Sequence, residues 1–183
     1  METFLDNSVL LITGSSRGIG AATARLAKAY GAKVALHGKE ESAELLKLGK
    51  ELGSPCYPCD VADRAAVKRV VKRIMKDFGR IDALVNNAGI ADRRPFLETT
   101  DEVWQNVFKV NVLGTVHFCQ EVIPHMQRQK YGRIVNVSSK RGFPATCGKP
   151  AYGASKAAVI LLTAALAKEF APDIAVNCAA PGF

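Results

Sequence analysis

The strongest constraint on the fold is an alternation of short apolar runs with longer segments of helical period. The runs predict strands at Val9–Thr13, Lys33–Leu36, Ile81–Asn86, Arg133–Val137 and Ile174–Cys178, with a weaker candidate at Pro55–Cys59. The periodicity predicts helices at Ala21–Tyr30, Ser42–Leu52, Arg64–Phe78, Asp101–Gln129 and Tyr152–Phe170. Continuous apolar strands between helices are typical of a parallel sheet covered on both faces. With right-handed crossovers, the predicted fold is an α/β, doubly wound parallel sheet.

Length and composition fit a globular domain of this kind. The chain has 183 residues, of which 48% are hydrophobic, so we expect one domain over residues 1–183 with a sizeable core. No apolar run reaches membrane-spanning length, and the N-terminus lacks the basic and apolar regions of a signal peptide. Five scattered cysteines argue against a disulfide framework and indicate a reducing cytoplasm.

The formal charge of +8 does not predict a nucleic-acid-binding protein. The basic residues are spread along helical segments such as Arg64–Lys76, as on a solvated helix face. No recognition helix, zinc-ligand spacing or RNP-like aromatic pattern is present in the sequence. The positive charge instead predicts attraction to anionic ligands, either phosphates or an acidic partner protein.

Two other groups of reactive side chains receive structural interpretations. Cys56 and Cys59 have the spacing of a redox motif but precede no helix directly, so buried small side chains are the better interpretation. His117 and His125 fall on one long helical segment without metal-ligand spacing. We therefore predict packing or surface roles for both histidines and no metal site.

A glycine-rich loop, Thr13-Gly-Ser-Ser-Arg-Gly-Ile-Gly20, joins the first predicted strand to the first helix. Glycines allow a tight turn and a close backbone approach, and a helix N-terminus presents free N–H groups to a pyrophosphate. The spacing is G-x-x-x-G-x-G rather than G-x-G-x-x-G. An ordinary glycine turn is the alternative, but three glycines between a strand and an Ala-rich helix favour nucleotide binding.

Tyr152 and Lys156 are four residues apart on a predicted helix, so both side chains lie on one face. A nearby ammonium favours the phenolate form of a tyrosine, which makes the phenol a donor and acceptor of protons. The pair is a weak signal alone, because both residue types are common on amphipathic helices. Its weight comes from the glycine loop, from Ser138-Ser139 and from Asn86-Asn-Ala-Gly89 in the same chain.

These motifs together resemble those of the short-chain dehydrogenase/reductase family, in the family's order and over essentially the whole chain. The matching stretches are Thr13-Gly-x-x-x-Gly-x-Gly20, Asp60-Val61, Asn86-Asn-Ala-Gly89, Asn111, Ser139, Tyr152-x-x-x-Lys156 and Pro181-Gly182. The resemblance implies a Rossmann-like fold and a nicotinamide cofactor. The implied cofactor-binding residues are Gly14, Ser15, Ser16, Arg17, Gly18, Ile19, Lys39, Asp60, Val61 and Asn87, together with Tyr152 and Lys156.

The resemblance also implies a catalytic set of Asn111, Ser139, Tyr152 and Lys156. Ser139, the second of the serine pair, would hold the substrate oxygen while Tyr152 transfers a proton, and Ser138 would be a structural hydroxyl. Asn111 would hold a water that links Lys156 to solvent, and a satisfied, helix-kinking contact is its alternative.

The implied roles of two cofactor-site residues have local alternatives. Asp60 would bind the adenine amino group by resemblance, but it could instead cap the helix near Asp63. Asn87 would line the ribose, but the Asn pair could instead be turn residues.

The end of the second strand favours NADP(H) over NAD(H). NAD selectivity uses a carboxylate about 20 residues beyond the glycine loop, whereas NADP requires positive charge for the 2′-phosphate. Gly38 stands where an NAD-preferring relative would carry Asp, and Lys39 follows it. Arg17 is a second cation for the same phosphate, and ordinary solvated charges are the alternative for both. Glu40 would weaken the field only if it turned inward.

The sequence stops at Pro181-Gly-Phe183, before the final strand and substrate helix of the family. We therefore expect a C-terminally incomplete fold with an exposed strand edge and a nicotinamide pocket open on one side.

Within the family, the glycine loop and the NADP features look most like bacterial 3-oxoacyl-(acyl-carrier-protein) reductases. The expected function is reduction of a 3-oxoacyl thioester. The alternatives are a sugar, polyol or other secondary-alcohol dehydrogenase, and a truncated, catalytically weak NADP-binding or dimerisation module. An acidic carrier protein would suit the basic chain, and its landing patch would contain Lys130, Arg133, Lys140 and Arg141. By resemblance, a homodimer or homotetramer forms through the two long helices.

Overall fold

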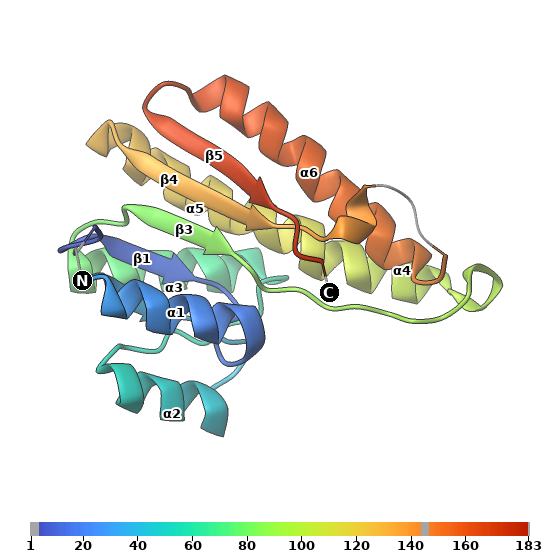
Figure 1. The fold of residues 1–183 in the computed structure, drawn as a ribbon, viewed down its shortest axis with the longest axis horizontal. Coiled ribbons are helices and arrows are strands. Elements are labelled where there is room, and N and C mark those ends of the chain that lie inside the picture. Colours follow the sequence, from blue (N-terminus) through green and yellow to red (C-terminus); the bar gives the residue numbers. More distant parts are fainter. Residues whose placement is uncertain (1–3, 144–146, 183) are drawn as a thin grey trace.

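The computed structural model describes residues 4–143 and 147–182, and the ends of the predicted domain lie outside these ranges. Its five-stranded sheet has the order β2-β1-β3-β4-β5, and every neighbouring pair is parallel. The strands are β1 Val9–Ile12, β2 Lys33–Leu36, β3 Ala83–Asn86, β4 Gly132–Val137 and β5 Ile174–Ala179. The chain reverses its order across the sheet between β1 and β3 (Figure 1), as the predicted doubly wound α/β fold requires.

The prediction of a sixth strand at Pro55–Cys59 is wrong. This segment makes one isolated parallel bridge, between Leu36 and Cys56, and its backbone bonds the end of β2. Two prolines within five residues remove the N–H donors that a regular ladder needs.

Helices cover both faces of the sheet. They are α1 Gly18–Ala29, α2 Ala43–Leu52, α3 Arg64–Phe78, α4 Asp101–Phe108, α5 Gly114–Gln129 and α6 Pro150–Phe170. Short 3₁₀ turns occur at η1 Phe96–Glu98 and η3 Lys140–Gly142, and η2 Lys109–Leu113 is a π-helical turn. Helix α3 has a clear cap at each end: the Asp63 side chain accepts from the Ala66 N–H at 3.0 Å, and Gly79 ends the helix in the left-handed region.

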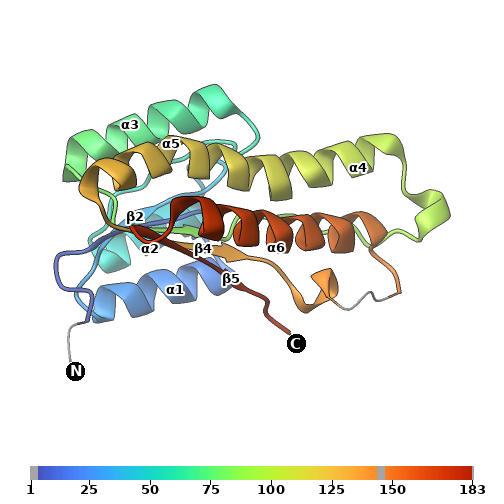
Figure 2. The same cartoon turned by 90° about the horizontal axis from the view of Figure 1, so that it is seen from above.

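Two buried clusters fix the layers. In one, α1 and α2 pack on the face that carries Leu10, Ile12 and Val34. In the other, α3, α5 and α6 pack on the face that carries Leu84 and Ile134. Figure 2 shows α1 on one side of the sheet and α3 and α5 on the other. Successive strand residues point to opposite faces, and β1 is buried on both, whereas Ala83 and Val85 of β3 are only partly buried on the face that carries Leu10.

The predicted helix Asp101–Gln129 is continuous but contains the π turn at Lys109–Leu113, with Asn111 at its middle. A π turn frees backbone groups that a regular α-helix would bond, and such turns are frequent at functional sites. The hydrophobic period detects the helix but not this local change in winding.

One of the described helices, α6, is long and apolar enough to cross a membrane by length and composition, with 21 residues and a mean hydropathy of 1.3. The expectation that no run reaches this length is therefore wrong. Alanines keep the hydropathy of α6 high, although Lys156 lies within it. Since α6 packs on the sheet beside β5 (Figure 1), we interpret it as a helix of the α/β fold.

Candidate active site

The glycine loop lies at the C-terminal edge of the sheet, between β1 and α1. Gly14 and Gly18 have φ angles of +63° and +57°, which L side chains rarely adopt. A Cβ at Gly14 would lie 2.8 Å from the Ala88 Cα, and a Cβ at Gly20 would lie 2.5 Å from the side-chain nitrogen of Asn87. The loop therefore needs glycine for its own packing, and it leaves the start of α1 free to receive an anion.

A cavity of about 460 Å³ lies beside this loop. The predicted cofactor residues that line it are Gly14, Ser16, Arg17, Ile19, Lys39, Asp60, Val61 and Asn87. Ser15 and Gly18 are not among its lining residues. Ser15 is fully buried and bonded to the backbone of β2's end, while Gly18 is exposed at the first position of α1.

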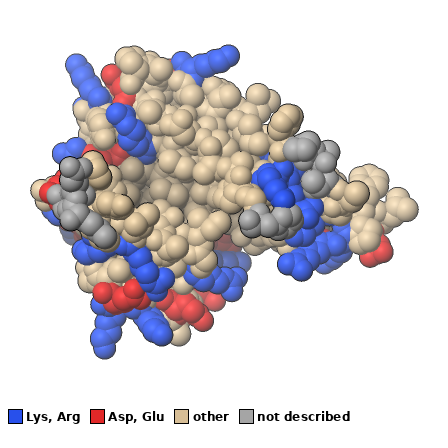
Figure 3. All heavy atoms as spheres, in the orientation of Figure 1, with Lys and Arg blue, Asp and Glu red and all other residues tan. Residues whose placement is uncertain are grey.

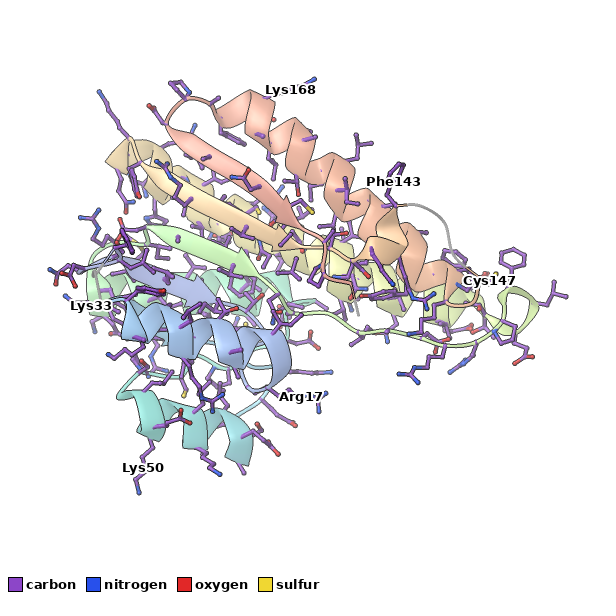
Figure 4. All side chains as sticks on the ribbon, in the orientation of Figure 1. Arg17, Lys33, Lys50, Phe143, Cys147 and Lys168 are labelled. Carbon is purple, nitrogen blue, oxygen red and sulfur yellow. The ribbon has the colours of Figure 1, made fainter. Side chains whose placement is uncertain are left out.

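Opposite charges meet at one end of this cavity. The Lys39 ammonium lies 3.3 Å from the Asp60 carboxylate. The Ala62 N–H and then Lys39 hold the pKa of Asp60 below its ordinary value. Arg17 extends from the loop at the N-terminal end of α1 (Figure 4). Two cations and one carboxylate thus surround the place predicted for the adenosine half of a dinucleotide.

The alternative in which Asp60 caps a helix does not agree with the structure. Asp60 accepts the Ala62 N–H at 2.9 Å, but the cap of α3 is Asp63.

Asn87 holds the glycine loop with both its backbone and its side chain. Its amide group donates to the Thr13 and Gly14 carbonyls, at 2.9 Å each, and its backbone N–H donates to the Thr13 hydroxyl. Asn87 therefore braces the glycine loop and lines the cavity, and its neighbour Asn86 is the last residue of β3.

Tyr152 and Lys156 lie together on the first turns of α6. The Lys156 Nζ is 5.7 Å from the centre of the Tyr152 ring and donates to the Val137 carbonyl at 2.8 Å. Lys156 is 5% exposed, and this burial lowers the pKa of its ammonium to about 8. The predicted pair is thus adjacent in space, and a single backbone carbonyl fixes the lysine.

The two serines after β4 differ in their surroundings. The buried Ser138 hydroxyl donates to the Lys156 carbonyl at 2.7 Å. The Ser139 hydroxyl accepts the Arg141 N–H at 3.2 Å, which leaves its own proton available to a ligand. This arrangement matches a structural role for Ser138 and a substrate-facing role for Ser139.

A second cavity, of about 270 Å³, is lined by three of the four predicted catalytic residues, all but Asn111. It is lined by Ser138, Ser139, Tyr152, Lys156 and residues of the loops that follow β3 and β5. Both cavities are also lined by Ile19, Asn87, Gly89 and Ile90. The two therefore form one groove along the C-terminal edge of the sheet, from Lys39 to Ser139. In open α/β sheets, ligands bind at this edge where the strand order reverses.

Asn111 is buried behind the groove, and both N–H groups and the oxygen of its amide are hydrogen-bonded within the fold. Its oxygen accepts the Ile90 N–H at 2.8 Å, and its nitrogen donates to the Ile90 carbonyl and the Ser155 hydroxyl at 2.9 Å each. These hydrogen bonds agree with the alternative prediction for Asn111, a side chain with satisfied partners at an irregular turn of the helix. The side chain also lies close to Lys156, because a Cβ at Gly89 would be 3.1 Å from the Asn111 oxygen and 3.4 Å from the Lys156 Nζ.

The predicted carrier-binding patch is wrong as a single surface. Lys130 ends α5 and Arg133 lies near the start of β4, whereas Lys140 and Arg141 follow the other end of that strand. Lys and Arg side chains gather beside the loop after β4, on the right of Figure 3. Sequence proximity placed all four cations near Ser139, but an extended strand of six residues separates the two pairs.

The sequence prediction missed several residues of the groove. His37, Asn106 and Val110 line the first cavity beside the predicted residues. His37 follows the apolar run of β2 directly, so a polar residue at the end of a buried parallel strand was the available signal.

The remaining candidates take structural positions. The buried His117 ring bonds the Val61 carbonyl at 2.9 Å. Burial raises the pKa of the Cys59 thiol to about 12, which disfavours the reactive thiolate. Among the described residues, no three metal-ligating side chains lie together.

Several known proteins are similar to this chain in sequence or fold. A 3-oxoacyl-[acyl-carrier-protein] reductase of Thermotoga maritima is 42% identical, and the match covers 98% of this chain and 75% of that protein. An acetoacetyl-CoA reductase of Rhizobium meliloti is 40% identical, with 96% and 73% covered. A crystal structure titled ribose-5-phosphate isomerase, from Brucella melitensis 16M, superposes with a TM-score of 0.95 at 31% identity, over 100% of this chain and 71% of that one.

The family model of short chain dehydrogenases matches residues 8–183, which include the glycine loop and the whole groove. The chain therefore belongs to the short-chain dehydrogenase family, and it is an oxidoreductase that acts on carbonyl or alcohol groups with a nicotinamide cofactor.

Proposed function

We propose that the chain is an NADP(H)-dependent reductase of 3-oxoacyl thioesters, with Ser139, Tyr152, Lys156 and Asn111 as its catalytic set. The observation that carries this proposal is the continuous groove that joins the glycine loop to the Tyr152–Lys156 pair. Relatives named as reductases of 3-oxoacyl-carrier and acetoacetyl-CoA substrates support the thioester class.

The groove fits a dinucleotide because its first cavity runs from the glycine loop at the start of α1 to Asp60 and Val61, with Arg17 and Lys39 in its lining. The glycine loop and the start of α1 would hold the pyrophosphate, with Asp60 and Val61 at the adenine. When bound, the nicotinamide supplies or accepts the hydride.

The chain's own residues position the substrate and move the proton. Ser139 donates its free hydroxyl proton to the substrate oxygen, where negative charge develops, and Tyr152 delivers a proton to the same oxygen. The Lys156 ammonium favours the phenolate that Tyr152 becomes, and it is held by the Val137 carbonyl. Lys156 retains further N–H groups for ribose hydroxyls or for a water that reprotonates Tyr152.

The preference for NADP(H) rests on Arg17 and Lys39, with Gly38 where a carboxylate would select NAD. The Lys39–Asp60 pair is exposed, so the contact costs little to break when a phosphate arrives. Titration of NADPH and NADH fluorescence tests the preference. We expect NADPH to bind more tightly than NADH. The Lys39→Asp substitution should weaken NADPH binding by about tenfold or more and change the affinity for NADH little. Equal effects on both cofactors would refute the assignment of Lys39.

Turnover with a panel of substrates tests the substrate class. The proposal predicts NADPH oxidation with acetoacetyl-CoA or a carrier-bound 3-oxoacyl group. Turnover restricted to sugars, polyols or other secondary alcohols would assign the alternative dehydrogenase function. Cofactor binding without turnover on any of these would favour a binding module.

An acidic carrier protein that bears the substrate is the proposed partner of this chain. It could dock at either of the two separated pairs of cations, Lys130 with Arg133 or Lys140 with Arg141. Charge reversal at Arg141 or at Lys130, one at a time, identifies the pair used. The reversal in the docking pair should raise the Michaelis constant for carrier-bound substrate but not for the small thioester. Equal effects on both substrates would argue against carrier docking at that residue.

A homodimer or homotetramer is proposed through α5 and α6. A groove of about 480 Å³ between these helices is lined by Val116, Ile123, Leu162, Leu166 and Phe170, with other side chains of the same two helices and Arg64 of α3. Leu161 is 73% exposed on α6. Light scattering should therefore show an oligomer that Leu161→Glu weakens, and a wild-type monomer at micromolar concentration would refute this assembly.

A further inference from the structure

His37 is a buried titratable side chain that the proposed reaction does not use. It follows β2 directly, is 1% exposed and lines the first cavity. Its ring meets the edge of Phe118 on α5, with ring centres 5.1 Å apart and planes at 85°. A polar ring in this position needs hydrogen-bond partners, since an unpaired buried polar group costs stability.

Both ring nitrogens have partners, and these partners belong to different parts of the groove. The Gly14 N–H donates to Nδ1 at 3.4 Å, and Nε2 lies 3.3 Å from the Cys59 sulfur. Because a backbone N–H can only donate, Nδ1 carries no proton and the proton sits on Nε2, directed at Cys59. Gly14 is in the glycine loop, and Cys59 directly precedes Asp60 at the adenine end.

The same residue also holds the loop through its backbone. The Ser15 N–H donates to the His37 carbonyl at 2.8 Å, and the His37 N–H donates to the Ser15 hydroxyl at 2.9 Å. Both bonds use backbone atoms of His37, so neither depends on its imidazole ring. They therefore serve as an internal reference for what the ring adds.

The surroundings of the ring keep it neutral. Burial lowers the pKa of His37 to about 4, and hydrogen bonding to the backbone at Cys59 and the nearby Asp60 carboxylate oppose this shift only partly. Arg17 and Lys39, which line the same cavity, add no negative charge. At neutral pH the imidazole therefore remains an acceptor at Nδ1. Catalysis is not its role, because His37 lines the cavity away from Ser139 and Tyr152.

We propose that His37 is a positioning residue that ties the glycine loop to the adenine-side segment, and so sets the geometry in which the loop receives a dinucleotide. Its Nδ1 fixes the Gly14 amide, its Nε2–H fixes Cys59, and Phe118 holds the plane of the ring. The inference rests on the dinucleotide-binding role of the loop. It assigns a role to a side chain outside the predicted cofactor-binding and catalytic residues.

Three substitutions separate this role from general stability. His37→Asn keeps an acceptor near the position of Nδ1, His37→Gln moves the amide toward the position of Nε2, and His37→Leu removes both polar atoms. Residue-resolved amide exchange of the free protein should show the Gly14 amide about tenfold faster in the Gln and Leu variants but near wild type in the Asn variant. The Ser15 amide should stay protected in all three.

The same variants are titrated with NADPH. We expect the Gln and Leu variants to bind NADPH about tenfold more weakly, the Asn variant to bind within about threefold of wild type, and kcat at saturating NADPH to be unchanged. Faster exchange of Gly14 and Ser15 together would overturn the inference, as would an Asn variant as weak as the Leu variant. If wild type binds neither NADPH nor NADH while the Gly14 amide responds as expected, the proposed function fails, and only the contact of His37 with the glycine loop stands.

Discussion

Lys156 is a buried ammonium, so its removal should stabilise the protein while it abolishes proton transfer. The pKa of Lys156 falls from 10.5 to about 8 on burial. This shift corresponds to a cost of about 3 kcal/mol at about pH 7, because the folded state disfavours the charged form that the unfolded state holds freely. In Lys156→Met the cost disappears, but the Val137 carbonyl loses its donor, which costs about 1–3 kcal/mol.

The pH dependence isolates the charge from the lost hydrogen bond. Between the folded pKa of about 8 and the unfolded value of 10.5, the unfolded state binds more protons, so wild-type stability gains from Lys156 as the pH rises. The methionine variant lacks this gain. Its stability relative to wild type should therefore fall by about 2 kcal/mol between about pH 7 and about pH 9.5, whatever the lost hydrogen bond costs.

Urea unfolding of both proteins at the two pH values measures this difference. Lys168→Met, which removes an exposed lysine from the same helix (Figure 4), is the matched control and should change stability equally at both pH values. A Lys156→Met difference that does not change with pH would refute the argument from burial.

Two further predictions concern the neighbours of Lys156. Gly89→Ala places a methyl group 3.1 Å from the Asn111 oxygen and 3.4 Å from the Lys156 Nζ, so kcat should fall by roughly tenfold or more with a smaller change in NADPH affinity, as steady-state kinetics would show. Ser138→Ala removes a buried donor and should lower the free energy of unfolding by about 1–2 kcal/mol, whereas Ser139→Ala should keep Tm and lose about 100-fold in kcat. The reverse pattern for the two serines would exchange their roles.

The layers of the fold were predictable because each strand and helix carries its own local signal. The helix Arg64–Phe78 was located to the residue, since Asp63 caps its start and Gly79 ends it. The segment Pro55–Cys59 misled the prediction because it runs beside β2 without forming a ladder. The apolar run that suggests a strand reflects burial of Tyr57 and Cys59, and burial alone does not require strand pairing.

The site was predictable where chemistry imposes a spacing, and not where it depends on packing across the sheet. The four-residue separation of Tyr152 and Lys156 directly gives their common face. By contrast, the bond from Gly14 to His37 joins two loops 23 residues apart. Likewise, the separation of Lys130 from Arg141 depends on the direction of β4, which their nearness in sequence conceals.

The most direct test of the proposed reaction is turnover by the wild type and Tyr152→Phe with NADPH and acetoacetyl-CoA, together with NADPH titration of both. The phenol oxygen is the only atom removed, so the account predicts that the variant loses turnover by at least about 100-fold and keeps its NADPH affinity. Turnover by Tyr152→Phe close to that of wild type would contradict the assignment of Tyr152 as the proton donor.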